Sequence, residues 1–461
     1  MHSVQTHMTA NLGARELVFR PTVEMQRNFD AKRGIHGEFT IIYRVHSDPD
    51  GGSIIVQNDY FAHFFAPPGL APLPKNILFI IDISGSMSGE KISQAREAML
   101  KILDDLRNHS TDTFNILIFD DRVETWRPSP TSTLGSEIDA ARGFVQERLQ
   151  SRGGTDIHRA LMEGLELLLK ERQEKSCDTA DIIVFLTDGD PTSGVTDIDS
   201  IIRDVTTKNG GRAAIFSLGF GFNLNFGFLS KVSDKNRGFA RRIYAEGDAP
   251  DQLKNFYDEV STPILCNVVA HYSMKVVDSD LLTFTTFPLL FEGQEIVVAG
   301  KTKMMAGQLD TSMMEAELQG TGAGGVVDFA VRPAKIQLLN ERGVEDDLTE
   351  KLWAYMKIKS LLKEADTTES EQDRNDARAL ALNMSLSYGF VTPLTSFSIV
   401  VEDVEPARND ESWARGKFAS GGGSKMASFP GYHANGDVGH AAALTWSWGI
   451  AVMVLASLLS Q

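Results

Sequence analysis

The chain has 461 residues, which is too long for one ordinary domain, so we expect two or three domains. Its apolar fraction of 42% is sufficient for buried cores and excludes a chain that is disordered throughout. The formal net charge of −17 argues against nucleic acid or an anionic membrane surface as the main partner. Two cysteines, Cys177 and Cys266, are too few for a disulfide-rich scaffold and do not have zinc-site spacing.

The first part of the chain is expected to be a disordered start followed by strands. Residues 1–14 have no apolar core of the kind that a signal peptide needs. Residues 15–70 contain segments rich in aromatic and β-branched residues, which favour strands. These segments lie at 39–45, 53–56 and 61–65. They are too little material for an independent sheet core.

Residues 75–262 alternate between apolar strands and amphipathic helices. This alternation predicts right-handed crossovers and a doubly wound, mostly parallel α/β sheet. The main strands are expected at 77–81, 114–119, 182–186 and 213–218, and the helices at 90–107, 136–150, 156–174, 198–207, 226–232 and 251–260.

The remaining chain changes character three times. Residues 264–345 favour strands again, whereas 346–402 indicate a helical region with a closing strand. A charged stretch at 364–374 separates two apolar helical stripes and is interpreted as a solvated turn. Residues 403–440 have the Gly, Ser and Ala composition of a linker, and 441–461 form a hydrophobic segment. The strands after residue 264 are expected at 267–272, 281–287, 295–299 and 326–331.

Three loops carry oxygen-bearing side chains to the edge where parallel strands end. Asp82, Ser84 and Ser86 follow the first buried strand, Thr155 follows a glycine pair, and Asp188 follows the strand at 182–186. Ligands of open α/β sheets bind beyond the carboxyl ends of the strands. Carboxylate and hydroxyl oxygens suit a hard cation such as Mg²⁺, with Mn²⁺ or Ca²⁺ as alternatives.

In this order, the five residues resemble the metal-ion-dependent adhesion site of von Willebrand factor type A domains. The resemblance implies that the cation keeps an open position for an acidic group of a partner. No nucleophile and base pair lies beside these residues in the sequence, and His158 is interpreted as a surface or capping histidine. We therefore expect no enzymatic activity.

Four further segments resemble the heavy chains of the inter-alpha-trypsin inhibitor, and the likeness runs from about residue 15 to 402. They read NDYFAHFFAPP at 58–68, LTDGDPTSGV at 186–195, LGFGF at 218–222 and YGFVTPLTS at 388–396. The family implies a type A domain inserted into a β-sandwich, whose halves would be 15–70 and 264–345. It also implies a preceding VIT domain, so we expect an N-terminally incomplete chain.

The resemblance points to a non-enzymatic extracellular adhesion or matrix protein, with hyaluronan or proteoglycan as partners. The Asp-Pro-His motif of covalently transferred heavy chains does not occur in the sequence, so covalent transfer is not expected. Protease inhibition belongs to the family's light chain and is not expected here. Two alternatives stay open: an intracellular type A interaction module, and a nucleotide-handling enzyme that uses the glycines after the strand at 213–218.

Two sequence features bear on the cellular compartment. Asn108 and Asn383 begin Asn-X-Ser sequons, which are glycosylation acceptors in secreted proteins. Cys177 and Cys266 each follow a helix, and both are expected at the face opposite the metal edge. A disulfide between them is left open, because it requires Cα atoms within about 7 Å.

The C-terminal segment predicts a lipid anchor. Residues 441–459 carry no charge and match the length of about 20 residues that a membrane span needs. No basic residues follow, which favours a glycosylphosphatidylinositol signal over a tail-anchored helix. Asn435, Gly436 and Asp437 form the expected attachment site, with Ser424 or Ser428 as alternatives.

Overall fold

The structure is a computed structural model. It describes residues 50–170, 177–221, 224–244, 248–303, 309, 311–338, 347–368 and 370–395. The predicted strand at 39–45, the linker at 403–440, the hydrophobic tail and its attachment site lie outside these residues. Two compact units divide the chain, one of residues 44–353 with 366–369 and one of the remainder. No helix within the described ranges is long and apolar enough to cross a bilayer.

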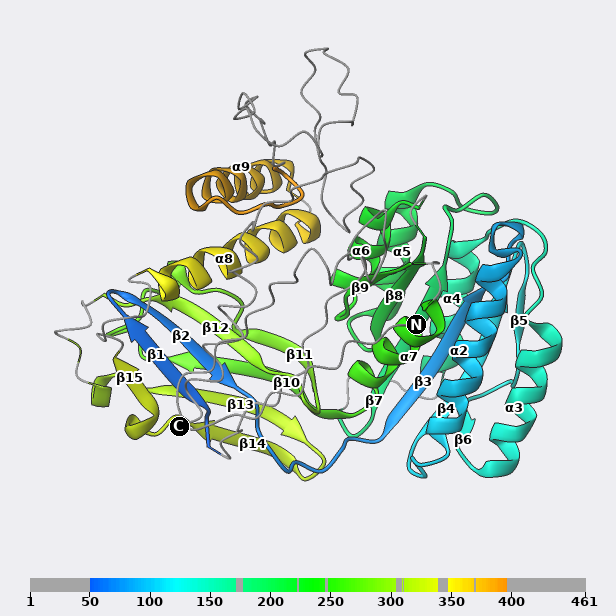
Figure 1. The fold of residues 1–461 in the computed structure, drawn as a ribbon, viewed down its shortest axis with the longest axis horizontal. Coiled ribbons are helices and arrows are strands. Elements are labelled where there is room, and N and C mark those ends of the chain that lie inside the picture. Colours follow the sequence, from blue (N-terminus) through cyan, green and yellow to red (C-terminus); the bar gives the residue numbers. More distant parts are fainter. Residues whose placement is uncertain are drawn as a thin grey trace, which may run out of the picture. The chain divides into compact units, whose positions relative to one another are not determined.

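Within the described ranges, a seven-stranded sheet forms the α/β part of the first unit (Figure 1). Its main path runs β5-β4-β3-β7-β8-β9, and β6 pairs with β4 off this path. The pairs β4–β3, β3–β7, β7–β8 and β8–β9 are parallel, whereas β5 and β6 are antiparallel to β4. The strands are β3 (Lys75–Asp82), β4 (Thr113–Phe119), β5 (Val123–Thr125), β6 (Thr131–Ser132), β7 (Ala180–Thr187), β8 (Ala214–Phe220) and β9 (Ala240–Ile243).

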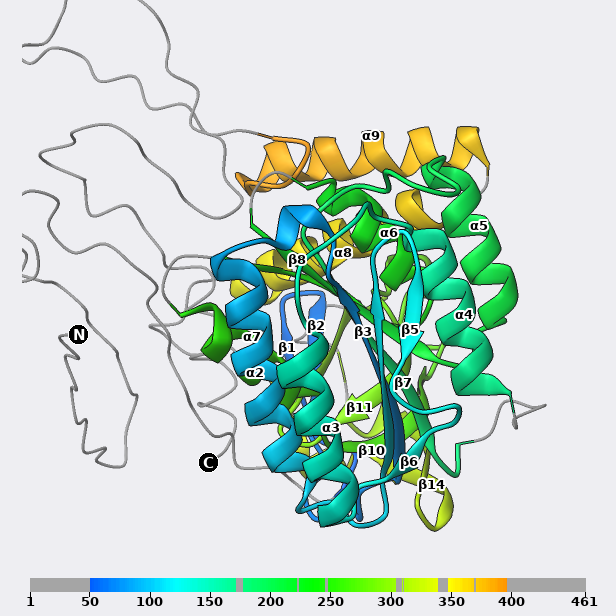
Figure 2. The same cartoon turned by 90° about the vertical axis from the view of Figure 1, so that its right-hand side faces the viewer.

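Helices cover both faces of this sheet (Figure 2). α2 (Glu90–Leu106), α3 (Gly135–Arg148) and α7 (Ala249–Val260) pack on one face, and α4 (Ile157–Leu169), α5 (Ile198–Asn209) and α6 (Phe226–Asp234) on the other. Side chains of β3 alternate between the two cores: Phe79 lies in the first and Ile80 in the second. An unbroken apolar strand therefore results from burial on both sides, and the predicted doubly wound α/β fold is confirmed.

A β-sandwich surrounds this α/β part in the sequence. One sheet has the order β12-β2-β1-β15 and the other β11-β10-β13-β14, and their facing side chains share one core. β1 and β2 precede the α/β part while the other strands follow it, so it is inserted into the sandwich. The exact domain limits stay predictions. The strands are β1 (Ser53–Gln57), β2 (Tyr60–Phe65), β10 (Pro263–Tyr272), β11 (Thr286–Phe291), β12 (Ile296–Lys301), β13 (Ala316–Gly322), β14 (Gly325–Ala330) and β15 (Ile336–Leu338).

Several sequence-based assignments after residue 264 are wrong in detail. The strand expected at 281–287 begins only at Thr286, because residues 279–281 form a short 3-10 helix. β13 and β15 were not predicted. β13 alternates buried and exposed positions as a half-buried strand should, but its sequence AELQGTG contains few β-branched or aromatic residues.

Two helices occur toward the end of the described chain, α8 (Leu348–Thr367) and α9 (Glu371–Tyr388). The charged stretch predicted as a turn is almost entirely helical, since only residues 368–370 lie between the two helices. The Ser370 hydroxyl accepts the backbone N–H of Asp373 at 3.2 Å and caps α9. Gly389 ends α9 in the left-handed conformation, with φ of 70°.

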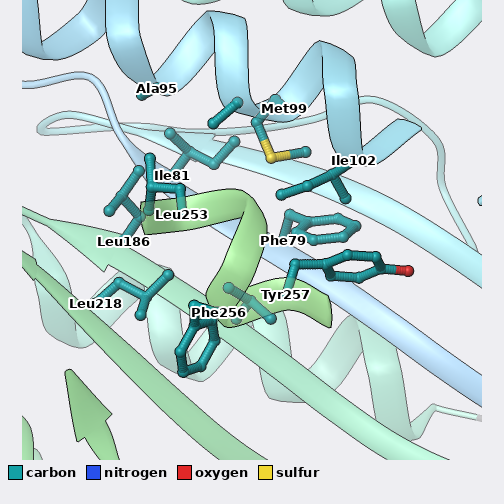
Figure 3. A pocket seen from close by; sticks show the side chains of 12 residues that line it. Phe79, Ile81, Ala95, Met99, Ile102, Leu186, Leu218, Leu253, Phe256 and Tyr257 are labelled. Carbon is teal, nitrogen blue, oxygen red and sulfur yellow. The ribbon is translucent and has the colours of Figure 1, made fainter. Parts of the chain in front are cut away.

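A small cavity of ≈ 20 Å³ lies among apolar side chains of the α/β core (Figure 3). It is lined by β3, β7, β8, α2 and α7, with Met99, Leu253 and Phe256 among the lining residues. Pockets for small molecules measure about 300 Å³ or more. The cavity is therefore a packing gap rather than a ligand site.

Contacts between the α/β part and the sandwich gather around Cys177 and Cys266. The two cysteines are paired as a disulfide with a Cα–Cα distance of 6.0 Å. The neighbouring Asn267 side chain accepts a hydrogen bond from Arg237 at 2.8 Å, and Arg237 also donates to the Pro288 carbonyl at 3.0 Å. Because Cys177 precedes β7 and Cys266 lies on β10, this bond would link the inserted part to the sandwich covalently.

We predict that non-reducing peptide mapping will recover the Cys177–Cys266 linkage. A bond that closes a loop of 89 residues is expected to stabilise the chain by about 4–5 kcal/mol in the loop-entropy treatment. The double variant Cys177→Ala/Cys266→Ala should lose that amount in denaturant unfolding. Reductant should destabilise the wild type equally and leave the double variant unchanged. Equal labelling by a thiol reagent before and after reduction would contradict the linkage.

His63 is buried in the sandwich in its neutral form. Its Nε2 lies 2.6 Å from the Gly51 carbonyl oxygen, which can only accept, so Nε2 carries the proton. Nδ1 lies 2.8 Å from the Tyr272 hydroxyl and accepts from it. Burial lowers the pKa of His63 from 6.5 to about 4, because a charged imidazole would lose its hydration.

This arrangement predicts acid sensitivity of the sandwich. The unfolded chain binds a proton at His63 near pH 6.5, but the folded chain does so only near pH 4, so stability falls as the pH drops across this window. The loss should be about 3 kcal/mol by pH 4. Urea unfolding of His63→Gln should have a shallower pH dependence, whereas the exposed His271→Gln should behave as wild type. An NMR titration of His63 near pH 6.5 would refute the prediction.

Candidate metal centre

The centre is built on Asp82, the last residue of β3. Parallel pairing aligns Ile81 with Leu186, so Asp82 and Thr187 stand side by side at the ends of β3 and β7. Asp82 is fully buried, and both of its carboxylate oxygens are held. Oδ1 accepts the backbone N–H of Ser84 at 2.7 Å, and Oδ2 accepts the Thr187 hydroxyl at 2.5 Å. These bonds fix the position of the carboxylate.

A chain of polar contacts runs from Asp82 to the surface. A short 3-10 turn at Gly85–Met87 brings the hydroxyls of Ser84 and Ser86 within 2.9 Å of each other. Ser86 then donates to Oδ1 of Asp188 at 2.7 Å. Ser84 and Asp188 are buried while Ser86 is exposed, so the cluster opens to solvent on the Ser86 side.

The loop that carries Thr155 lies against both of the other predicted loops. The Gly85 N–H donates to the Gly153 carbonyl at 3.1 Å, and the Thr155 N–H donates to the Thr192 hydroxyl at 2.9 Å. Gly153 has φ of +68°, and a Cβ there would lie 2.6 Å from an Asp121 carboxylate oxygen, so this turn needs glycine. Thr155 is buried at this edge through backbone contacts, and the role of its hydroxyl as a ligand stays a prediction.

Two contacting residues were missed by sequence reasoning, Thr187 and Lys91. Thr187 orients Asp82, as described above. Lys91, in the first turn of α2, donates to Oδ2 of Asp188 at 2.5 Å. The signal for Thr187 was its place between a buried strand and Asp188. No sequence signal could distinguish Lys91 from an ordinary surface lysine of an amphipathic helix.

The residues present fit a hard divalent cation. The donors are carboxylate and hydroxyl oxygens, the class that Mg²⁺ and Ca²⁺ prefer. Burial raises the pKa of Asp82 to about 6, because the ionised form is poorly solvated, and a nearby cation would offset that cost. Within the described residues, no group of three or more His, Cys, Asp or Glu side chains is arranged so that it could hold a metal ion by itself.

Asn108, Asn383 and His158, the other residues considered in the sequence, make no hydrogen bond or ion pair with this cluster in the described part of the chain. Asn108 lies exposed just after α2. Asn383 is exposed on α9, but Ser385 of its sequon is buried. The ring of His158 lies 3.1 Å from an Asp204 carboxylate oxygen on the neighbouring helix. This contact agrees with its interpretation as a surface histidine.

The two glycines considered for a phosphate loop have other roles, close packing at Gly219 and a left-handed backbone conformation at Gly221. Gly219 lies inside β8, and a Cβ there would come within 2.7 Å of the Leu224 side chain. Gly221 has φ of +89° just after the strand, where no described helix begins until Phe226. A phosphate loop would lead directly into a helix N-terminus, so this geometry does not favour the nucleotide-binding alternative.

Comparison with known proteins assigns a domain family to the α/β part of the chain. Residues 76–259 match the von Willebrand factor type A domain family. A solved structure with the same kind of domain, a von Willebrand factor type A protein from Catenulispora acidiphila, is 14% identical. The structural match covers 75% of this chain and 89% of the Catenulispora acidiphila protein, with a TM-score of 0.49.

Curated relatives extend the similarity beyond this domain. Inter-alpha-trypsin inhibitor heavy chain H4 of Homo sapiens is 38% identical over 389 residues, which are 84% of this chain and 41% of that protein. Heavy chain H3 of Rattus norvegicus is 38% identical over 404 residues, or 86% and 44%. The chain thus spans about two fifths of the length of these relatives. It belongs to the inter-alpha-trypsin inhibitor heavy chain family, with a von Willebrand factor type A domain at residues 76–259.

Proposed function

We propose that the protein is a non-enzymatic extracellular adhesion or matrix protein that captures an acidic group of a partner through a divalent cation. The observation that carries this proposal is the clustering of Asp82, Ser84, Ser86 and Asp188 at the strand ends, with Ser86 facing solvent. These residues, with Thr155, would hold Mg²⁺, Mn²⁺ or Ca²⁺. The cation would supply an open coordination position for a partner's carboxylate oxygen.

The charge of the cluster supports ligand capture. Its two carboxylates, Asp82 and Asp188, carry a formal charge of −2, which a divalent cation neutralises. The remaining donors are uncharged, so negative charge from the protein does not fill the coordination shell. An acidic ligand can then fill the open coordination position with an oxygen, in the way that metal sites with few protein carboxylates recruit substrate oxygens. The contacts around the cluster include no paired base and nucleophile, so we propose no hydrolytic or transfer reaction.

The proposed setting is outside the cell. Membership of the heavy chain family supports secretion, and the exposed Asn108 is compatible with glycosylation there. Hyaluronan or proteoglycan matrix is the proposed environment, and lipid anchoring through residues 441–461 stays a proposal. An intracellular interaction module is the competing reading. Treatment of the cell-derived protein with a glycosidase separates the two, because only the secreted form should change mobility.

We predict that Asp82→Ala abolishes divalent cation binding, reducing affinity by about a hundredfold or more, because it removes the buried carboxylate on which the loops converge. Mn²⁺ binding to the full chain is measured by isothermal titration calorimetry. The matched control is Asp190→Asn, an exposed carboxylate two residues after Asp188 that contacts the Asn225 N–H. The control should bind Mn²⁺ as the wild type does.

The same variants test partner capture. Wild-type protein that is incubated with extracellular material should bind its ligand in the presence of Mg²⁺ and should not bind it in EDTA. The Asp82→Ala variant should not bind the ligand even in Mg²⁺. Asp190→Asn should retain it. Capture that persists both in EDTA and in Asp82→Ala, with circular dichroism unchanged, would overturn the proposed function.

A further inference from the structure

Lys91 makes an ion pair with a buried carboxylate of the metal cluster. Its Nζ donates to Oδ2 of Asp188 at 2.5 Å and lies 3.4 Å from the Ser86 carbonyl oxygen. The Asp188 side chain is 0% exposed and that of Lys91 is 33% exposed. An ordinary surface lysine extends its ammonium group into water, whereas this one is directed into the cluster.

The position of Lys91 on its helix makes this contact informative. α2 begins at Glu90 after Gly89, whose φ is 81°, so Lys91 lies in the first helical turn. The N-terminus of a helix carries partial positive charge and disfavours cations. Helix stability therefore does not account for a lysine here. The contact with Asp188 supplies the compensating attraction, since an ion pair with a buried carboxylate is stronger than one in water.

The formal charge of the cluster differs between its empty and its metal-loaded state. Asp82 and Asp188 give −2, and Lys91 changes this to −1. A bound divalent cation would bring the total to +1 with Lys91 and to 0 without it. Lys91 therefore has opposite effects on the two binding steps, because its charge repels a cation and attracts an anion.

We infer that Lys91 is a built-in cation of this centre, which neutralises Asp188 in the empty site and keeps the loaded site net positive for an anionic ligand. This inference rests on the proposed function. Lys91 reduces the affinity for the metal and increases the affinity of the loaded site for a carboxylate. It thereby favours acidic over neutral ligands.

The test replaces Lys91 with methionine, which keeps the length and apolar stem of the side chain and removes its charge. Lys91→Met should bind Mn²⁺ about tenfold more tightly. Even at the dielectric constant of water, the repulsion between like charges a few ångströms apart is large enough to change an affinity by about that factor. In EDTA its melting temperature should fall by roughly 3–6 °C, because a buried carboxylate loses its cation. Poly-L-glutamate should bind the Mn²⁺-loaded variant severalfold more weakly in surface plasmon resonance.

Lys101→Met is the matched control, since Lys101 lies on the same helix and pairs only with the exposed Glu97 and Asp251 in the described contacts. It should leave Mn²⁺ affinity, melting in EDTA and poly-L-glutamate binding unchanged. Unchanged or weaker Mn²⁺ binding by Lys91→Met would overturn the inference, as would unchanged melting in EDTA. If the wild type binds no Mn²⁺, the proposed function fails. The melting comparison still tests neutralisation of Asp188 in that case.

Discussion

The structure depends on the burial of Asp82 at the end of the central strand. β3 is covered by helices on both faces and paired on both edges, so its last residue is placed with little freedom. A carboxylate at such a position is costly unless its oxygens are paired. Ser84 supplies that pairing from the loop after β3, and Thr187 supplies it from the end of β7. The same bonds therefore satisfy a buried charge and fix the geometry of the centre.

The loops at this edge constrain one another through close backbone contacts. Gly85 donates to Gly153, and Thr155 is held by Thr192, so three loops that are far apart in sequence form one surface. Side chains larger than hydrogen would collide at Gly153 and Gly154. Precise placement of small residues thus allows hydroxyl and carboxylate groups to converge without a large pocket. This agrees with recognition of a partner at the surface rather than of an enclosed small molecule.

The sandwich is completed across the insertion. β2 pairs with β1 on one side and with β12 on the other. The paired residues of β2 and β12 are more than 230 positions apart in the sequence. The α/β part is entered from β2 in one sheet and left through β10 in the other, so both of its ends connect to the sandwich. Arg237 and Asn267 add polar contacts near the same junction.

The sequence by itself determined the doubly wound α/β fold and four clustered residues of the centre, Asp82, Ser84, Ser86 and Asp188. The split sandwich was expected from the family resemblance. Apolar runs and strand-end carboxylates are local patterns, and parallel strands necessarily bring their ends to one edge. The tertiary structure alone decided the rest. β13 carries weak local propensity and forms because β10 and β14 flank it. The contacts of Thr187 with Asp82 and of Lys91 with Asp188 join residues about a hundred positions apart. No local pattern encodes such contacts, since they depend on how packed strands and helices direct individual side chains.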